Sequence, residues 1–398
     1  MTDSPNGLAS ADVRRHNLSI MLRHLASAGP SSRSDLAEET GLKRGSITPL
    51  VQILNEAGLV RETTSVVGAR GRPRTNLELT GEHIGLLVVQ IASDEITGVV
   101  TTLGGAEIAR LSSAHHAEFG DSDAVLNATA AVVESLIGTA GSRRCEVADA
   151  TIVTQSPVGG EPAHVLGDAH MGWDSVDVLG ALHDRVPSLR SIRSQLSSDA
   201  PLAALAELRR IGAPANAVYI KGDNTTIGGA LVVHGDVVEG AHGFGGSLGH
   251  LAVVPDGVAC ACGQHGCLVT VAGFGALTQR FASADAGLPP ATLADLVARI
   301  RSGEPAAVAA WGDAVVWIAR ALEILSMAVD PAVIVVGGQW APLADSVDKA
   351  FRRNRPFAAA SGELATRVVP GTLGADAALT GGIESAQQRV LADAEKIL

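Results

Sequence analysis

The sequence predicts an α/β fold for residues 82–398 and a smaller, helix-rich domain for residues 1–80. After residue 82, apolar strand patterns alternate with helical patterns, which is typical of layered α/β folds. Of the 398 residues, 46% are hydrophobic and 18% are charged, so a large core is expected. Residues 1–80 hold ten Arg and Lys against eight Asp and Glu, whereas the whole chain has a net charge of −12. Only the first domain is therefore expected to approach an anionic partner.

Residues 11–80 show the pattern of a winged helix-turn-helix domain. A second helix is expected to begin at Ser32, where Asp35 completes a capping box, and to end at Gly41. Pro49 lies one turn into the third helix, which therefore either begins late or bends there. Two strands are expected at 58–62 and 75–79. A first amphipathic helix is expected to start with Asn17, Ile20, Leu22 and Leu25. The apolar stripe of the third helix is formed by Ile47, Leu50, Val51 and Leu54.

The polar side of the third helix offers groups that can meet phosphates or base edges in a major groove. These candidates are Lys43, Arg44, Ser46, Thr48 and Gln52. The loop between the two strands contains Arg70 and Arg72 around a glycine, a pattern that can follow a narrow minor groove. Double-stranded operator DNA is the expected partner. The alternative is a solvated basic loop on a small helical domain.

The remainder of the chain is expected to alternate between strands and helices. Strands are expected at 85–91, 96–101, 148–153, 217–220, 228–233 and 332–336. Helices are expected at 122–139, 202–211, 313–329 and from about 375 to the end. The amphipathic stretch 311–327 can be a core helix or part of an interface between subunits.

No membrane span is expected, because the richest apolar stretch, 314–336, is interrupted by charged residues. No signal peptide is expected either, because the N-terminus lacks a basic flank followed by an apolar core. Four cysteines in a chain of this length do not indicate a disulfide scaffold, so a reducing cytoplasm is the expected location. Cys145 stands apart from the others and is predicted to be a core residue.

Three of the four cysteines, Cys260, Cys262 and Cys267, fall within eight positions, and His250 lies ten residues upstream. Three thiolates and one imidazole complete a closed tetrahedral shell for structural zinc. Gly263 and Gly266 allow the tight backbone that such a cluster needs. In the alternative interpretation, the cysteines are small buried hydrophobic residues and His250 lies on the surface.

This cysteine cluster, with its flanking glycines, is similar to the signature of the ROK family (repressor, open reading frame, kinase). The N-terminal order of helices and the Gly-Arg-Pro loop also resemble the DNA-binding half of ROK repressors, so the resemblance runs from about Ala11 to the end. It implies two actin-like lobes of the hexokinase type with a cleft between them. The first lobe would be 82–198 with the C-terminal helix 375–398, and the second, with the zinc knuckle, 199–374.

The resemblance also indicates that the phosphotransfer motifs are degenerate. Gln90 stands where the first phosphate loop has an aspartate, and the second loop, 222–229, contains an acid that would repel phosphate. Asp199 remains of the catalytic motif; it either accepts a hydrogen bond from a ligand hydroxyl or caps the helix that follows. Ser247 and Val269 replace the two glutamates that contact sugar in the family. His250 remains there, although zinc is its expected partner.

These observations predict a non-enzymatic, DNA-binding regulator of the ROK type for carbohydrate-related genes. A homodimer or homotetramer would bind operator DNA, and a sugar or sugar-derived effector in contact with Asp199, Ser247 and His250 would control it. An active ATP-dependent, glucokinase-like sugar kinase is one alternative. A regulator controlled by a protein partner through its acidic surface is another.

Overall fold

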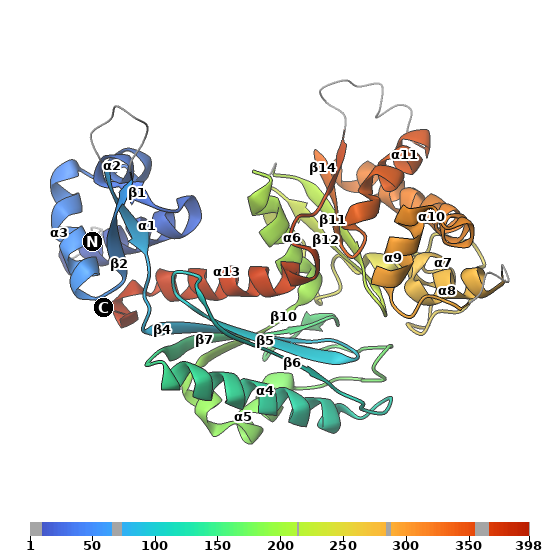
Figure 1. The fold of residues 1–398 in the computed structure, drawn as a ribbon, viewed down its shortest axis with the longest axis horizontal. Helices are drawn as coiled ribbons and strands as arrows, with labels where there is room; N and C mark the ends of the chain where they lie inside the picture. The colour runs from blue at the N-terminus through green and yellow to red at the C-terminus, as the bar shows by residue number, and fades with distance from the viewer. Residues whose placement is uncertain (1–9, 66–73, 213–214, 284–287, 355–365, 398) are drawn as a thin grey trace, which may run out of the picture.

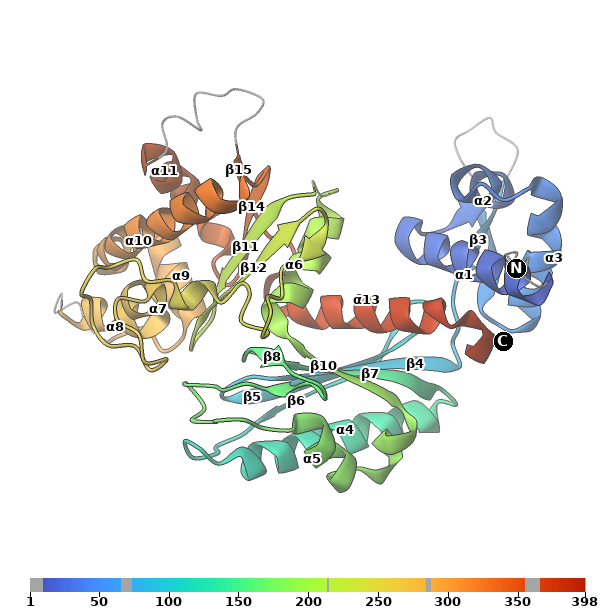
Figure 2. The same ribbon diagram turned by 180° about the vertical axis from the view of Figure 1, so that it is seen from behind.

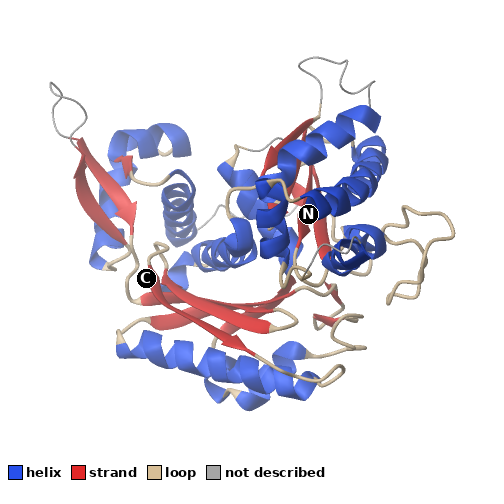
Figure 3. Cartoon of the chain, turned by 45° about the vertical axis from the view of Figure 1, so that its right-hand side comes forward, coloured by secondary structure: helices blue, strands red, loops and turns tan. Residues whose placement is uncertain are grey.

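The computed structural model describes residues 10–65, 74–212, 215–283, 288–354 and 366–397, which form a small N-terminal domain and two larger lobes (Figure 1). Each lobe is built on a five-stranded sheet. Helices cover the outer faces of both sheets, and further helices lie between them (Figure 3). The predicted layered α/β architecture is therefore present in the part of the chain after residue 82.

The N-terminal domain contains three helices and a three-stranded antiparallel sheet of order β1-β3-β2. The predicted capping box is confirmed: the Ser32 hydroxyl accepts from the Asp35 N–H, and the Asp35 carboxylate accepts from the Ser32 N–H. Gly41 ends the second helix with φ 70°. The elements are α1 (Ser10–Ala28), β1 (Ser31–Ser32), α2 (Arg33–Thr40), α3 (Arg44–Glu56), β2 (Val60–Ser65) and β3 (Arg74–Leu79).

Helix α3 buries its predicted apolar stripe, formed by Ile47, Leu50, Val51 and Leu54. It begins at Arg44 and continues through Pro49, so the first of the two alternatives, a late start, is wrong. Proline lacks an N–H, and one helical hydrogen bond is therefore missing there. Burial of the four apolar side chains offsets this loss.

The first lobe has the strand order β10-β7-β4-β5-β6. Strands β10, β7 and β4 run parallel, and the β4-β5-β6 meander is antiparallel. Helices α4 and α5 cover one face of this sheet, and α13 covers the other (Figure 1). The bounds are β4 (Ile84–Ile91), β5 (Glu95–Thr102), β6 (Glu107–Ala114), α4 (Ser122–Ser142), β7 (Glu146–Thr154), α5 (Val178–Arg185), β10 (Arg193–Ser198) and α13 (Ala377–Ala392).

The second lobe has the strand order β13-β12-β11-β14-β15, with β11, β14 and β15 parallel. On α10, the side chains proposed either for an interface or for the core, Val315, Ile318, Leu322 and Leu325, are all buried, so the core interpretation is confirmed. The bounds are α6 (Asp199–Arg210), β11 (Ala217–Gly222), β12 (Ile227–Val233), β13 (Asp236–Val237), α7 (Leu268–Ala272), α8 (Phe274–Ser283), α9 (Leu293–Ser302), α10 (Pro305–Val329), β14 (Val333–Gly338), α11 (Ala344–Asn354) and β15 (Arg367–Pro370).

Helices α6 and α13 pack against each other between the two sheets (Figure 2). Two adjacent glycines on α13 make this close packing possible. A Cβ on Gly381 would lie 2.1 Å from the Leu202 carbonyl oxygen of α6, and one on Gly382 would lie 2.7 Å from a Val88 methyl carbon of β4. The packed pair forms a core that belongs to both lobes.

The N-terminal domain shares its core with the C-terminal helix. Met21 and Leu22 of α1 belong to the same apolar cluster as Val390 and Leu391 of α13. The Ser19 hydroxyl also donates to the Leu391 carbonyl over 2.7 Å in a buried position. Helix α13 therefore extends from the cleft between the lobes to the N-terminal domain (Figure 2).

Sequence patterns did not predict the edge strands β6, β10, β13 and β15, nor helices α5, α7, α8, α9 and α11. Strand β6 alternates exposed and half-buried positions and has no buried residue, so it carries little apolar signal. Helix α4 is long and apolar enough to span a membrane by length and composition. Its apolar side chains, such as Val125, Val133 and Leu136, are buried against the first sheet, as in a core helix.

Candidate functional site

The predicted metal ligands come together. His250, Cys260, Cys262 and Cys267 each offer one ligand atom, and these atoms lie within 4.8 Å of one another. The Cys262 and Cys267 sulfurs are 3.6 Å apart, as are the Cys260 sulfur and the His250 Nδ1. A tetrahedral zinc ion with Zn–S of about 2.3 Å and Zn–N of about 2.0–2.1 Å requires edges of roughly 3.6–3.8 Å. The four residues can therefore hold a metal ion.

The local backbone supports this cluster. Gly266 has φ 71°, and a Cβ there would lie 1.9 Å from the Val254 carbonyl oxygen. Burial and the hydrogen bond with Cys262 raise the pKa of Cys267 to about 12, so a bound cation would have to displace its proton. Burial, together with His170, lowers the pKa of His250, which favours the neutral imidazole that metals bind. The fourth cysteine, Cys145, is buried in the first lobe, as predicted.

A cavity of about 890 Å³, called here the larger cavity, lies beside this cluster between the lobes. Sites for small organic ligands occupy roughly 300–1,000 Å³, so its size is suitable. Ser247 and His250, two of the predicted ligand contacts, line it. Asp168 also lines it, but its carboxylate is engaged by the Ser156 hydroxyl and by the backbone N–H groups of His170 and Met171. Asp168 therefore stabilises the loop that forms this wall of the larger cavity.

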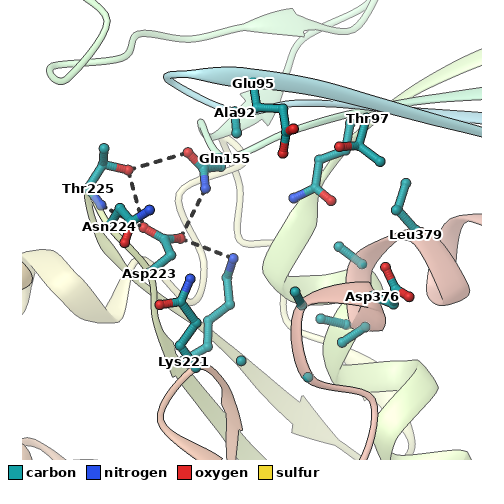
Figure 4. A pocket seen from close by; sticks show the side chains of 18 of the residues that line it. Ala92, Glu95, Thr97, Gln155, Lys221, Asp223, Asn224, Thr225, Asp376 and Leu379 are labelled. Atoms are coloured by element: carbon teal, nitrogen blue, oxygen red, sulfur yellow. Dashed lines mark hydrogen bonds and ion pairs between the residues drawn. The ribbon is translucent and has the colours of Figure 1, made fainter. Parts of the chain in front are cut away.

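A second cavity, of about 360 Å³ and called here the smaller cavity, lies at the end of the β4-β5 hairpin (Figure 4). Gln90, Ala92 and Ser93 line it from the first lobe, and the loop after β11 lines it from the second. Gln155 and Thr225 line both cavities. The Gln155 side-chain amide donates to Asp223 over 3.0 Å, so a hydrogen bond joins the two lobes where the two cavities share lining residues.

The backbone of the loop after β11 binds a carboxylate of the same loop. The Asp223 carboxylate accepts from the backbone N–H groups of Thr225 and Thr226 over 3.0 and 2.8 Å. Consecutive backbone N–H groups in such a turn are the groups that bind phosphate in nucleotide loops. Because a carboxylate of the same loop occupies them, a phosphate would have to displace it.

Asp199 does not cap the helix that follows it. It is the first residue of α6, Ser198 is the N-cap, and Asp199 lines neither of the two cavities. Its buried carboxylate instead accepts from the Lys221 ammonium over 2.5 Å. Burial alone would lower the pKa of Lys221, but the attraction of Asp199 and Asp223 raises it above its ordinary value. The lysine therefore stays cationic and neutralises the carboxylate.

Lys221 and Gln155 are the site residues that sequence reasoning missed. A signal for Lys221 was present, because it is the one charged residue in the apolar run 217–222, and a buried lysine requires a carboxylate partner. Gln155 follows strand β7 in a loop, and no pattern in the sequence distinguishes it. Val269, by contrast, is partly buried against the core of the second lobe.

Three of the predicted DNA-contacting residues lie on one exposed face of α3. Arg44, Thr48 and Gln52 are spaced by four residues and are exposed, so they share one face of the helix. Lys43 is exposed at the helix start, and Ser46 is half-buried. Gln52 also donates to Glu56 over 2.8 Å. Arg70 and Arg72 lie outside the residues that the structure describes.

Comparison with known proteins adds a family match. The model of the ROK family matches residues 97–389. The xylose repressor of Bacillus spizizenii is 22% identical over 269 residues, covering 64% of this chain and 65% of the repressor. The transcriptional dual regulator NagC of Escherichia coli is 24% identical over 277 residues, covering 67% and 65%. The chain thus matches 65% of the length of each regulator.

Kinases are also among the similar proteins. The kanosamine kinase of Amycolatopsis mediterranei is 32% identical over 211 residues, covering 53% of this chain and 67% of the kinase. Among solved structures, a ROK family transcriptional regulator homologous to the E. coli MLC protein has a TM-score of 0.74 at 24% identity, covering 97% and 99%. A ROK family glucokinase from Streptomyces griseus has a TM-score of 0.63 at 24% sequence identity, covering 76% of this chain and 99% of the glucokinase. These similarities show a two-lobed, sugar-kinase-like fold.

Proposed function

Because the chain belongs to the ROK family, we propose that it is a DNA-binding transcriptional regulator of carbohydrate-related genes. In this proposal residues 1–80 are a winged helix-turn-helix domain, 82–198 with 375–398 form the first lobe, and 199–374 form the second. The exposed row on α3, Arg44, Thr48 and Gln52, is the observation that carries it. The repressors and regulators among the similar proteins support it.

The two-lobed domain is proposed to be a sensor without catalytic activity. Gln90 stands in place of a metal-organising acid, Asp223 occupies the N–H groups of its own loop, and Lys221 neutralises Asp199. Phosphoryl transfer needs a metal site, a bound nucleotide phosphate and a free base. The three features just named act against these three requirements, in the same order. The kinases among the relatives keep the alternative open to test.

The larger cavity is the proposed effector site, with Ser247 and His250 in its wall. A sugar or sugar-derived molecule is the proposed effector. Helix α13 is the proposed route to the DNA-binding domain, because it packs on α6 at one end and on α1 at the other. An effector shifts DNA affinity only if it binds one arrangement of the lobes more tightly than another.

The Cys3His cluster is proposed to hold a structural zinc ion. When bound, the ion would tie the loop around Cys262 to His250, which lines the larger cavity. The protein is further proposed to act in the cytoplasm as a homodimer or homotetramer. A two-fold axis would present two copies of α3 to operator DNA, with half-sites about one helical turn, or a multiple, apart.

Selection of bound genomic fragments, followed by fluorescence anisotropy on the recovered DNA, tests the proposal. Arg44→Ala is expected to weaken binding by about 1–3 kcal/mol, and loss of each phosphate contact to reduce the salt slope by about 1. The control is Arg190→Ala, an exposed arginine in the first lobe that pairs with Asp184. Equal affinity of the three proteins for every recovered fragment would refute DNA recognition by α3.

A further inference from the structure

The smaller cavity is lined by more carboxylates than cations. Among its lining residues, Asp94, Glu95, Asp223 and Asp376 are acidic, and Lys221 and Arg110 are basic. Both basic side chains are already paired. Lys221 contacts Asp199 and Asp223, and Arg110 contacts Asp376 over 3.0 Å and Glu107 over 3.2 Å.

Two of the carboxylates are free to meet a ligand. Within the described part of the chain, the side chains of Asp94 and Glu95 make no hydrogen bond or ion pair. Both lie at the turn between β4 and β5, are exposed to solvent and line the cavity. Figure 4 shows Glu95 on the strand side of the cavity, across from Lys221 and Asp223. An anionic ligand would be repelled here, whereas a cation would be attracted.

Buried polar atoms give independent evidence for a ligand. Tyr219 is 1% exposed and lines the cavity, and its hydroxyl has no hydrogen-bond partner among the described residues. The Gln339 Oε1, also buried and in the same wall, likewise has no partner in that part of the chain. Buried polar groups in proteins are nearly always hydrogen-bonded, so such groups at a cavity wall indicate a missing partner. A ligand that donates hydrogen bonds would satisfy both.

We propose that the smaller cavity binds a small organic cation, an ammonium-bearing molecule with further hydrogen-bond donors. Its ammonium group pairs with Asp94 and Glu95, and its other donors reach Gln339 Oε1 and the Tyr219 hydroxyl. Amino sugars and linear polyamines share this chemistry. The site is separate from the proposed effector site, and the Gln155–Asp223 hydrogen bond lies where the two cavities share lining residues.

Isothermal titration calorimetry on the full chain tests the proposal. The probes are glucosamine, N-acetylglucosamine, spermidine and Mg·ATP. Glucosamine or spermidine is expected to bind. N-acetylglucosamine has the same ring without the charge and is expected to bind this site about two- to thirtyfold more weakly. Binding of glucosamine alone, or of spermidine alone, identifies which source of the ammonium group the cavity accepts.

Matched variants locate the binding. The double variant Asp94→Asn/Glu95→Gln keeps the side-chain shapes, changes only exposed residues and is expected to lower the amine affinity about two- to thirtyfold. Tyr219→Phe is expected to lower it about two- to tenfold. Asp174→Asn, which removes one carboxylate from the larger cavity, is expected to change it less than twofold.

Three results would overturn the proposal: no heat with either amine, loss of amine binding in Asp174→Asn only, or displacement of the amine by Mg·ATP. DNA affinity of the double variant is measured in parallel by anisotropy. Unchanged DNA binding with lost amine binding supports the second site without relying on the proposed regulator function. If the wild-type protein bound no DNA, the proposed regulator function would be refuted, and the amine result would still stand.

Discussion

Replacing Lys221 with methionine removes the cation from a buried pair. The Lys221 ammonium lies 2.5 Å from an Asp199 oxygen and 3.3 Å from an Asp223 oxygen. Lys221 is 8% exposed and Asp199 is 3% exposed, so water cannot replace the lost partner. Loss of one member of a buried ion pair costs about 3–5 kcal/mol, because the other charge remains buried. We therefore expect the free energy of unfolding of the second lobe to fall by this amount.

Urea titration followed by tryptophan fluorescence measures this change. Trp311, Trp317 and Trp340 all lie in the second lobe, and only Trp173 lies in the first, so the emission reports mainly on the lobe that contains β11. The double variant Lys221→Met/Asp199→Asn removes the buried charge as well. It is expected to be more stable than Lys221→Met alone, by about 2 kcal/mol or more.

The stability of Lys221→Met is expected to depend on pH. Without Lys221, burial raises the folded-state pKa of Asp199 above its unfolded value of about 3.9. The folded state then binds the proton more tightly, so stability is lost as pH rises above the unfolded pKa. The deficit of Lys221→Met should be smaller at pH 5 than at pH 8. A loss below about 1 kcal/mol at pH 8, or a double variant as unstable as the sum of the single ones, would refute the reasoning.

Three further predictions concern the metal, the chemistry and the domain contact. Elemental analysis of protein purified without chelator should find one zinc per chain, and Cys267→Ser should lose it; metal-free wild-type protein would contradict this. A coupled assay with ATP should detect no phosphorylation of any hexose; turnover that disappears in Asp199→Asn would show a kinase instead. Leu391→Ala should lower the stability of the contact with α1 by about 2–5 kcal/mol. Amide hydrogen exchange in α1 should then be faster than in the wild-type protein, while β11 stays protected. An unchanged exchange rate in α1 would argue against packing of the N-terminal domain on α13.

Much of the local structure could be predicted from residue patterns. Capping by Ser32 and Asp35, the stop at Gly41 and the apolar stripe of α3 are all written in short segments, and the structure has all three. The continuous apolar run of β4 likewise predicted a buried strand. These features depend on neighbours within one or two turns, so the sequence contains the whole of their physical cause.

The Cys3His cluster is an intermediate case. Close spacing and the two glycines are sufficient to predict a shared site, since few backbone paths are available to Cys260, Cys262 and Cys267. His250 was assigned through its distance along the chain and the family resemblance. The structure places its ring nitrogen 3.6 Å from the Cys260 sulfur.

The state of the cleft is determined by tertiary contacts. From the sequence, Asp199 either accepts a hydrogen bond from a ligand hydroxyl or caps a helix. In the structure Lys221, 22 residues later on β11, packs against it and neutralises it. Gln155 is hydrogen-bonded to Asp223, 68 residues later in the chain, and this bond joins the two lobes. Local patterns determine which elements form, because their causes are short-range. Which charges meet, which stay free and which cavities remain depend on groups that only the folded chain brings together.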